Sequence, residues 1–299
     1  MAMNRIQVQS ILFNNEPADI KRALEGIARA ARVLRASRNV IVDVAYGDCS
    51  PGQPCLSDAD VKEMETILAD GTFRYVFFNA NLGSAEGHNR LAAGIEHGYL
   101  LIQNPDVIGE AEYLIHLLEA FDTPSCGMAE ARQLPIEHPK DYDPETGETS
   151  WATTACALIP ADLFVQLDGF DSKTFFLYCD DVDFSWRVRL AGRKVIFQPA
   201  SVVFHDKRLK SDGSWMPSNA ERYYSIEAAL LMAHKYSRPK RVKEVLAMCD
   251  HLSADEVFAK AAARFREMEE LGELPEALDP EHRVSEFHRD DYAIHRFVI

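Results

Sequence analysis

The stretch FRYVFFNANLGSAEGHNRLAAGIEHGYLLIQ, residues Phe73–Gln103, decides the fold class. Its first part, Phe73–Asn79, is rich in aromatic residues and predicts a strand. The next part, Ser84–Gly98, has apolar residues at helical spacing, and Tyr99–Gln103 is a short apolar run that again predicts a strand. A strand, a helix and a strand in this order are typical of a parallel βαβ unit.

The segments before this unit show the same alternation. Asn39–Val44 is a continuous β-branched run, as expected of a strand that is buried on both faces. Pro17 suits the first turn of a helix and Ser57 suits an N-cap. The full order is strand Arg5–Phe13, helix Pro17–Ser37, strand Asn39–Val44 and helix Ser57–Asp70. This alternation predicts an α/β fold with a mostly parallel, doubly wound sheet flanked by helices over the first ~105 residues.

Ligands of such sheets bind beyond the carboxyl ends of the strands, so the residues that follow each strand are site candidates. We expect Asp43 at the end of the second strand. Gly83 and Gly87 let backbone approach a phosphate, and the N-terminus of the helix that follows favours anions. Asp106 offers a carboxylate that suits a hard divalent cation bridging diphosphate oxygens. Each of these residues could equally be an ordinary turn or cap residue.

The pattern changes after the fourth strand. Glu137–Trp151 is polar and rich in turn residues, which predicts a surface loop or a mobile flap. After His205 the chain is helical, with a capping box of Ser253 and Glu256 expected at the last long helix. We therefore predict a catalytic domain over residues 1–215 and a helical C-terminal extension over residues 216–299.

Composition limits the kinds of partner. The chain has 299 residues and a formal net charge of −15, so duplex nucleic acid is an unfavourable partner. The sequence shows neither a signal peptide nor an apolar run near the ~18 residues that a membrane span needs. Its six cysteines form no CxxC pair, which indicates reduced thiols in a cytoplasmic protein.

The stretch FFLYCDDVDFSWRVRLAG, Phe175–Gly192, sets three aspartates against an aromatic run. Asp180 or Asp181 could cap the helix that begins there, and Asp183 could pair with Arg187 at i,i+4. A calcium loop is excluded because its sixth position would be Trp186 where that loop requires glycine. One carboxylate then remains at a helix start beside an aromatic patch, where it can serve as a general base.

Together with NLGSAEGHN and QNPDV, the segment from Gly169 to His205 resembles family 2 glycosyltransferases, especially the bacterial rhamnosyltransferase-like branch. The resemblance covers roughly Ile6 to His205. It implies a GT-A fold, a nucleotide-sugar donor and inversion at the anomeric carbon. The family usually has Glu-Asp-x-Asp where this chain has Asp180-Asp181-Val182-Asp183, so Asp181 stands in the position of the catalytic base.

The resemblance also implies roles for other residues. Asp106 looks like the surviving acid of the family's Asp-x-Asp metal motif, with Asn104 in place of the first acid. His205 resembles the histidine that completes the site for the divalent metal, Mg²⁺ or Mn²⁺, or for the diphosphate. The residues expected to bind the donor are Phe13, Asn14, Asp43, Asn81, Gly83, Asn89 and Asp106. Those expected on the acceptor side are Asp180, Tyr178 and Trp186.

These residues predict an inverting glycosyltransferase that moves a sugar from a nucleotide-diphosphate sugar to a hydroxyl of a glycan or lipid-linked acceptor. Two alternatives remain. A sugar-phosphate nucleotidyltransferase shares the sheet type but typically needs a glycine-rich and basic loop after the first strand, where this chain has FNNEPAD. A non-catalytic sugar-nucleotide-binding protein is compatible with the single metal-type acid, Asp106, and with the altered VDVAYGD segment.

The C-terminal helices predict association with a second copy of the chain or with the inner face of a membrane. The segment YYSIEAALLMAHKY carries a broad apolar stripe. Next to it is the densest basic patch of the chain: Arg238, Lys240, Arg241 and Lys243. Such a pair of features suits anionic headgroups. The alternative is that the stripe packs on the catalytic domain and the basic residues face water.

Overall fold

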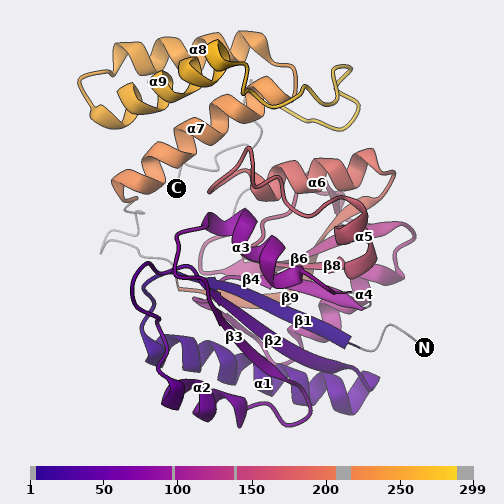
Figure 1. Ribbon diagram of the computed structural model, residues 1–299. Coiled ribbons are helices and arrows are strands. Elements are labelled where there is room, and N and C mark those ends of the chain that lie inside the picture. The colour runs from indigo at the N-terminus through magenta and orange to yellow at the C-terminus, as the bar shows by residue number, and fades with distance from the viewer. Residues whose placement is uncertain (1–4, 96–97, 138–139, 207–216, 288–299) are drawn as a thin grey trace.

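The computed structural model describes residues 5–95, 98–137, 140–206 and 217–287 (Figure 1). The strands are β1 (Arg5–Leu12), β2 (Ile41–Asp48), β3 (Phe73–Phe77), β4 (Tyr99–Gln103), β5 (Val107–Gly109), β6 (Cys126–Leu134), β7 (Glu148–Thr149), β8 (Cys156–Pro160) and β9 (Lys194–His205). The helices are α1 (Pro17–Arg38), α2 (Asp58–Glu65), α3 (Gly83–Ala92), α4 (Tyr113–Glu119), α5 (Ala161–Gln166), α6 (Asp180–Leu190), α7 (Asn219–Lys235), α8 (Pro239–His251) and α9 (Glu256–Leu271).

The strands form one sheet in the order β3-β2-β1-β4-β8-β6-β9-β5, with β7 paired to β9. The first four strands along the chain are parallel, as the sequence predicts. Strand β8 is antiparallel to both of its neighbours, β4 and β6. The start of β8 and the segment before it therefore lie at the same edge of the sheet as the carboxyl ends of β1–β4.

Apolar side chains cover both faces of the sheet, because strand residues point alternately to opposite sides. Tyr99 and Leu101 of β4 belong to the cluster that packs under α1 and α4. Leu100 and Ile102 belong to the cluster on the other face, which includes residues of α3, α5 and α6. The sheet is thus a buried middle layer, as expected for α/β topology.

Helices α7, α8 and α9 lie together at one end of the molecule, next to α6 (Figure 1). They share a third hydrophobic cluster with α6 and with the loop before it, in which Trp186 packs with residues such as Tyr236 and Phe265. The predicted domain boundary falls within residues 207–216, outside the described residues. The division into residues 1–215 and 216–299 stays a prediction.

Three local predictions are settled by the helix and strand ends. Ser57 does cap α2, in a capping box with Asp60. The capping box predicted for Ser253 is wrong, since Asp255 is the N-cap of α9 and accepts from the Val257 N–H. Strand β2 was predicted to end at Val44, but it continues to Asp48. Because β2 is longer than predicted, Asp43 does not lie at its end.

Candidate active site

The longer β2 strand changes which aspartate stands at the carboxyl edge of the sheet. Asp43 is only the third residue of β2, opposite Gln7 of β1, and Arg5 binds both of its oxygens at 2.8 Å. The prediction that Asp43 ends the strand is therefore wrong. Asp48 ends the strand instead, opposite Leu12. Asp48 is fully buried, and sequence reasoning missed it.

Four donors hold the Asp48 carboxylate. The N–H groups of Ser50 and Cys55 donate to it at 2.8 and 2.6 Å, and the Tyr75 hydroxyl and Cys55 thiol also donate to it. Burial raises the pKa of Asp48, but hydrogen bonds, chiefly from Ser50, Tyr75 and Cys55, outweigh it, so the pKa lies below its ordinary value. Asp48 is therefore a fixed anion at the carboxyl edge of β2.

Phe13 and Asn14 follow β1 beside this carboxylate. Asn14 has a left-handed φ of 54°, and its N–H donates to the Ser50 hydroxyl at 2.8 Å. The Cys49 N–H donates to the Leu12 carbonyl at 2.9 Å, so the two strand ends are tied together. Phe13 stays 47% exposed. The exposed Phe13 ring thus offers a flat apolar surface to a ligand, at a strand end that the buried Asp48 carboxylate holds in place.

Asp106 and His205 meet at the opposite half of the same edge. Val107 pairs with His205 across β5 and β9, and the Asp106 carboxylate lies 3.3 Å from Nε2 of His205. Nδ1 of His205 lies 2.7 Å from Oε1 of the buried Gln133. The Gln133 amide thus holds the imidazole ring through Nδ1, and Nε2 faces Asp106.

This arrangement fits a divalent cation with two protein ligands. A carboxylate suits Mg²⁺ or Mn²⁺, and a neutral imidazole fixed through its other nitrogen is the form that binds metals. Among the described residues no group of three or more His, Cys, Asp or Glu side chains could hold an ion. A cation at Asp106 and His205 would thus complete its coordination with ligand oxygens and water.

The turn before α6 positions Asp180 and Asp181. Tyr178 and Cys179 both have left-handed backbone, with φ of 67° and 59°, which is uncommon for residues other than glycine. Cys179 is the N-cap and makes no side-chain cap, so the expected capping by an aspartate is wrong. Asp180 and Asp181 instead lie in the first helical turn, where the helix dipole stabilises negative charge.

Asp181 is buried, and helix α6 fixes it to the edge of the sheet. Its Oδ1 accepts from the Val182 N–H at 2.9 Å, and its carbonyl accepts from the Ser185 hydroxyl at 2.7 Å. Ser185 in turn accepts from the Ala152 N–H at 3.0 Å, in the segment that leads to β8. Asp181 is therefore held at the edge where the parallel strands end.

Comparisons with solved structures agree with this architecture. The crystal structure of GalNAc-T7 with UDP, GalNAc and Mn²⁺ matches with a TM-score of 0.61 and 12% identity over 79% of this chain and 48% of that one. The mannosyltransferase PcManGT from Pyrobaculum calidifontis, in complex with GDP-Man and Mn²⁺, matches with a TM-score of 0.57 and 14% identity over 89% and 81%. The chain has the GT-A glycosyltransferase fold.

S. aureus TarS has the same type of fold, with a TM-score of 0.53 and 15% identity over 77% of this chain and 40% of that one. In sequence, 65 residues are 32% identical to the N-acetylglucosaminyl-diphospho-decaprenol L-rhamnosyltransferase of Mycobacterium tuberculosis. That segment covers 22% of this chain and only 21% of the relative. No family model matches the chain. The solved structures thus support the GT-A fold, and the shared segment is similar to about a fifth of that rhamnosyltransferase.

Two residues expected to bind the donor are used inside the GT-A fold. A Cβ on Gly83 would lie 2.2 Å from the Phe176 carbonyl oxygen, so this glycine lets α3 pack on the loop before α6. Asn89 accepts from the Phe170 N–H at 2.9 Å and donates to the Phe170 carbonyl at 2.8 Å. Asn81 is exposed just before α3. Of these three residues, Asn81 alone is exposed to a ligand at the helix start.

The acceptor-side prediction for Trp186 is wrong. Trp186 is fully buried, and its ring packs edge-on against Tyr236 at 4.6 Å and against Phe287 at 5.3 Å. Other aromatic rings lie near the turn that precedes α6. Phe176 stacks on Tyr224 of α7 with ring centroids 4.7 Å apart. Helix α7 thus contributes aromatic surface beside Tyr178, which sequence reasoning missed because α7 lies far along the chain.

Asp183 has charged and hydrogen-bonding partners on both α6 and α7. The predicted pair with Arg187 is confirmed, at 2.8 Å. Asp183 also lies 2.6 Å from Nζ of Lys235 and accepts from the Tyr236 hydroxyl at 3.0 Å. The side chain is fully buried. The third carboxylate of the motif is thus a fully partnered anchor.

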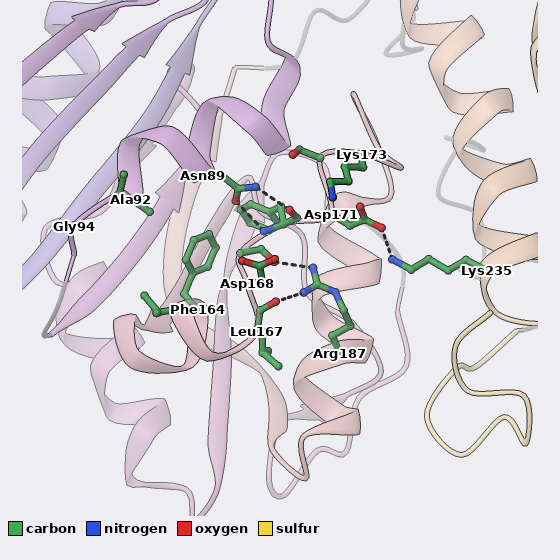
Figure 2. Close-up of a pocket in the computed structure, with 15 residues that line it drawn as sticks. Asn89, Ala92, Gly94, Phe164, Leu167, Asp168, Asp171, Lys173, Arg187 and Lys235 are labelled. Atoms are coloured by element: carbon green, nitrogen blue, oxygen red, sulfur yellow. Dashed lines mark hydrogen bonds and ion pairs between the residues drawn. The ribbon is translucent and has the colours of Figure 1, made fainter. Parts of the chain in front are cut away.

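A pocket of about 610 Å³ lies between the end of α3, α5, the loop after α5, α6 and α7 (Figure 2). Of the predicted site residues only Asn89 lines it. Three of its polar side chains have partners: Asn89 donates to the Phe170 carbonyl, Arg187 donates to backbone carbonyls, and Lys235 pairs with Asp171, as Figure 2 shows. The pocket marks the junction of these helices.

Proposed function

We propose that this chain is an inverting glycosyltransferase that moves a sugar from a nucleotide-diphosphate sugar to a hydroxyl group of a glycan or lipid-linked acceptor. The observation that carries the proposal is the pairing of Asp106 with His205 at the same edge of a GT-A sheet as the buried Asp181. The pair of Asp106 and His205 suits the leaving diphosphate, and the Asp181 carboxylate suits the attacking hydroxyl.

On the donor side, we assign contact with the nucleotide base to the exposed Phe13 ring, at the strand end that the buried Asp48 carboxylate holds in place. Asp48 stands at the strand end, beside the exposed Phe13 ring, whereas the Asp43 carboxylate is bound by Arg5. The Phe13 ring provides stacking surface, and Asn14 fixes the turn. Asp106 and His205 would hold the divalent cation, which neutralises charge developing on the diphosphate.

On the acceptor side, Asp181 takes the proton of the attacking hydroxyl. Asp181 lies in the first turn of α6, at the positive end of the helix dipole. The Val182 N–H holds the carboxylate and the Ser185 hydroxyl holds the backbone carbonyl of Asp181, which saves the entropy of orienting the reactants. Phe176 and Tyr224 form an aromatic surface that suits a sugar ring or a lipid-linked acceptor, with Asp180 and Tyr178 at its edge.

One observation favours the alternative of a non-catalytic sugar-nucleotide-binding protein. The described residues contain no metal cluster of three or more side chains. Hydrolysis of UDP-GlcNAc, GDP-mannose and dTDP-rhamnose, each measured with and without Mn²⁺, separates the two functions. We expect slow hydrolysis of one donor that requires Mn²⁺. Binding of a donor without any hydrolysis or transfer would contradict the proposed function.

Replacing Asp106 tests the metal site. We expect Asp106→Ala to weaken binding of the nucleoside diphosphate about tenfold or more in Mn²⁺ and to change it little in EDTA, because the carboxylate acts through the cation. Calorimetric titration of UDP and GDP in both conditions measures this. The control is Asp122→Ala, in the 3-10 turn Ala120–Asp122 that follows α4 and precedes β6. Equal affinity of the wild-type protein with and without Mn²⁺ would show that no cation bridges the ligand.

The apolar stripe of α7, which was expected to contact a membrane, is not available for that contact. Much of the apolar stripe of α7 is covered, since Leu230 and Leu231 are buried in the shared cluster and Ala233 is buried as well. These residues therefore offer no surface to a membrane or a second copy. No helix among the described residues is long and apolar enough to cross a bilayer. The surface left is that of α8, where Met248 is 43% exposed.

We propose that α8 contacts anionic lipid through Lys240 and Lys243, which lie one turn apart on this helix. The protein should co-sediment with phosphatidylglycerol vesicles, not with phosphatidylcholine vesicles, and binding should fade with salt because charges are screened over about 8–10 Å. Replacing both lysines with glutamate should abolish binding. Light scattering tests association with a second copy. Absence of vesicle binding and a monomeric mass together would exclude both partners.

A further inference from the structure

Lys235 is a buried lysine that joins two parts of the active-site region. It is the last residue of α7 and is only 4% exposed. Its Nζ lies 2.6 Å from Asp171 and 2.6 Å from Asp183, and 5.4 Å from the centre of the Phe175 ring. Figure 2 shows Lys235 reaching from α7 across to Asp171. Few lysines are buried without such partners, because the desolvated charge is costly.

The two carboxylates stand on opposite sides of the strained turn that precedes the proposed base. Asp171 organises the start of the loop: its side chain accepts from the Thr174 N–H at 3.1 Å and its carbonyl from the Phe175 N–H at 2.9 Å. Asp183 lies in the first turn of α6, two residues after Asp181. Lys235 therefore bridges the start of the loop and the start of the helix, and Tyr178 and Cys179 lie between them.

The bridge is electrically balanced. Lys235 and Arg187 carry two positive charges, and Asp171 and Asp183 carry two negative charges. Arg187 also donates to the carbonyls of Leu167 and Gly169 at 2.7 and 2.8 Å, which fixes the loop further. Burial raises the pKa of Asp171, but the attraction of Lys235 and the hydrogen bonds outweigh it. The group can thus stay buried and charged in one geometry.

Left-handed backbone at two successive residues persists only where the surroundings hold it in place. We propose that Lys235 is a positioning residue for the sugar-transfer reaction: by tying Asp171 to Asp183, it holds the strained turn and so aims Asp181 at the acceptor hydroxyl. This inference rests on the proposed function. It assigns to the last residue of α7 a contribution that acts through Asp171 and Asp183.

The test separates positioning from stability with a charge-balanced variant. Lys235→Met alone leaves an excess buried carboxylate and is expected to unfold easily. The double variant Lys235→Met with Asp171→Asn removes one charge of each sign, so the remaining pair of Asp183 and Arg187 stays balanced and the protein is expected to fold. Lys235→Arg keeps the charge and serves as the conservative rescue. Lys260→Met, an exposed lysine of α9, is the matched control.

For each variant, kcat and KM are measured with UDP-GlcNAc, GDP-mannose and dTDP-rhamnose in Mn²⁺, and hydrogen–deuterium exchange is followed in the full chain without ligand. In the double variant we expect kcat to fall about 100-fold with KM changed less than about threefold, since a misplacement near 1 Å costs that much. Exchange should accelerate in residues 172–183 and stay unchanged in β1–β4. Lys235→Arg should recover at least about tenfold in kcat.

A double variant that folds and keeps kcat within about threefold of the wild type, with unchanged exchange in residues 172–183, would overturn the positioning role. Failure of the proposed function looks different, because the wild-type protein itself would then turn over none of the three donors. Even in that case the exchange measurement decides whether Lys235 holds the turn, since it needs no substrate. The control Lys260→Met should match the wild type in every measurement.

Discussion

Asp181→Asn should lower kcat for sugar transfer by about 100-fold or more while leaving donor affinity near that of the wild type. The amide keeps the shape of the side chain and can still accept from the Val182 N–H. It cannot take a proton from the acceptor hydroxyl, and general-base catalysis is worth roughly 10²–10⁴-fold. Steady-state kinetics, with calorimetric titration of the nucleoside diphosphate in Mn²⁺, measure the two effects separately.

Asp162→Asn is the matched control for this experiment. Asp162 also lies in the first turn of a helix, α5, and its Oδ1 accepts from the next N–H at 2.8 Å, as that of Asp181 does. It is exposed and outside the proposed site. The control should retain full activity. An Asp181→Asn variant with more than about a tenth of the wild-type kcat would show that another group is the base.

Asp183→Asn should mainly lower the free energy of unfolding. The change leaves Lys235 and Arg187 with only the Asp171 carboxylate between them, so one buried positive charge is uncompensated. Removing one partner of a buried ion pair costs about 3–5 kcal/mol, and the hydrogen bonds of both cations to other groups put the expected loss near the lower end of that range. Urea unfolding followed by tryptophan fluorescence measures it, with an unchanged m-value expected.

The same Asp162→Asn variant provides the stability control, because it removes an exposed charge of the same kind. Its free energy of unfolding should lie within about 0.5 kcal/mol of the wild-type value. A loss below about 1 kcal/mol for Asp183→Asn would show that the buried charges gain little from each other. Full activity and full stability together would exclude both a catalytic and an anchoring role for Asp183.

The parallel half of the sheet could be predicted from the sequence because its strands are apolar runs separated by helical periodicity. The end of β2 could not. After Val44 the chain reads Ala45-Tyr46-Gly47, which interrupts the β-branched run and suggests a turn. In the fold, a Cβ at Gly47 would lie 2.7 Å from the Phe78 ring, so glycine is there for close packing. Pairing with β1 up to Leu12 then extends β2 to Asp48.

In the candidate site, too, contacts within one helix could be predicted from the sequence, whereas contacts between distant segments could not. The pair of Asp183 and Arg187 is four residues apart on one helix, and local spacing was enough to predict it. The partners of Asp183 on α7, and the ring of Phe287 against Trp186, come from segments more than fifty residues away. Without the fold, the sequence does not show which face of α6 those segments cover, so Trp186 was assigned to the acceptor side.

The shared cluster of α6 with the C-terminal helices also sets an order of assembly. A ribosome releases the chain from its N-terminus, and domains generally fold as they emerge. Strands β1–β4 can pair early, but Trp186 and Asp183 must wait for Tyr236 and Phe287 before they are covered. The helix that carries Asp181 is therefore completed last. A nascent chain arrested before Tyr236 would carry a paired parallel half of the sheet, while the apolar face of α6 around Trp186 would stay uncovered and prone to association.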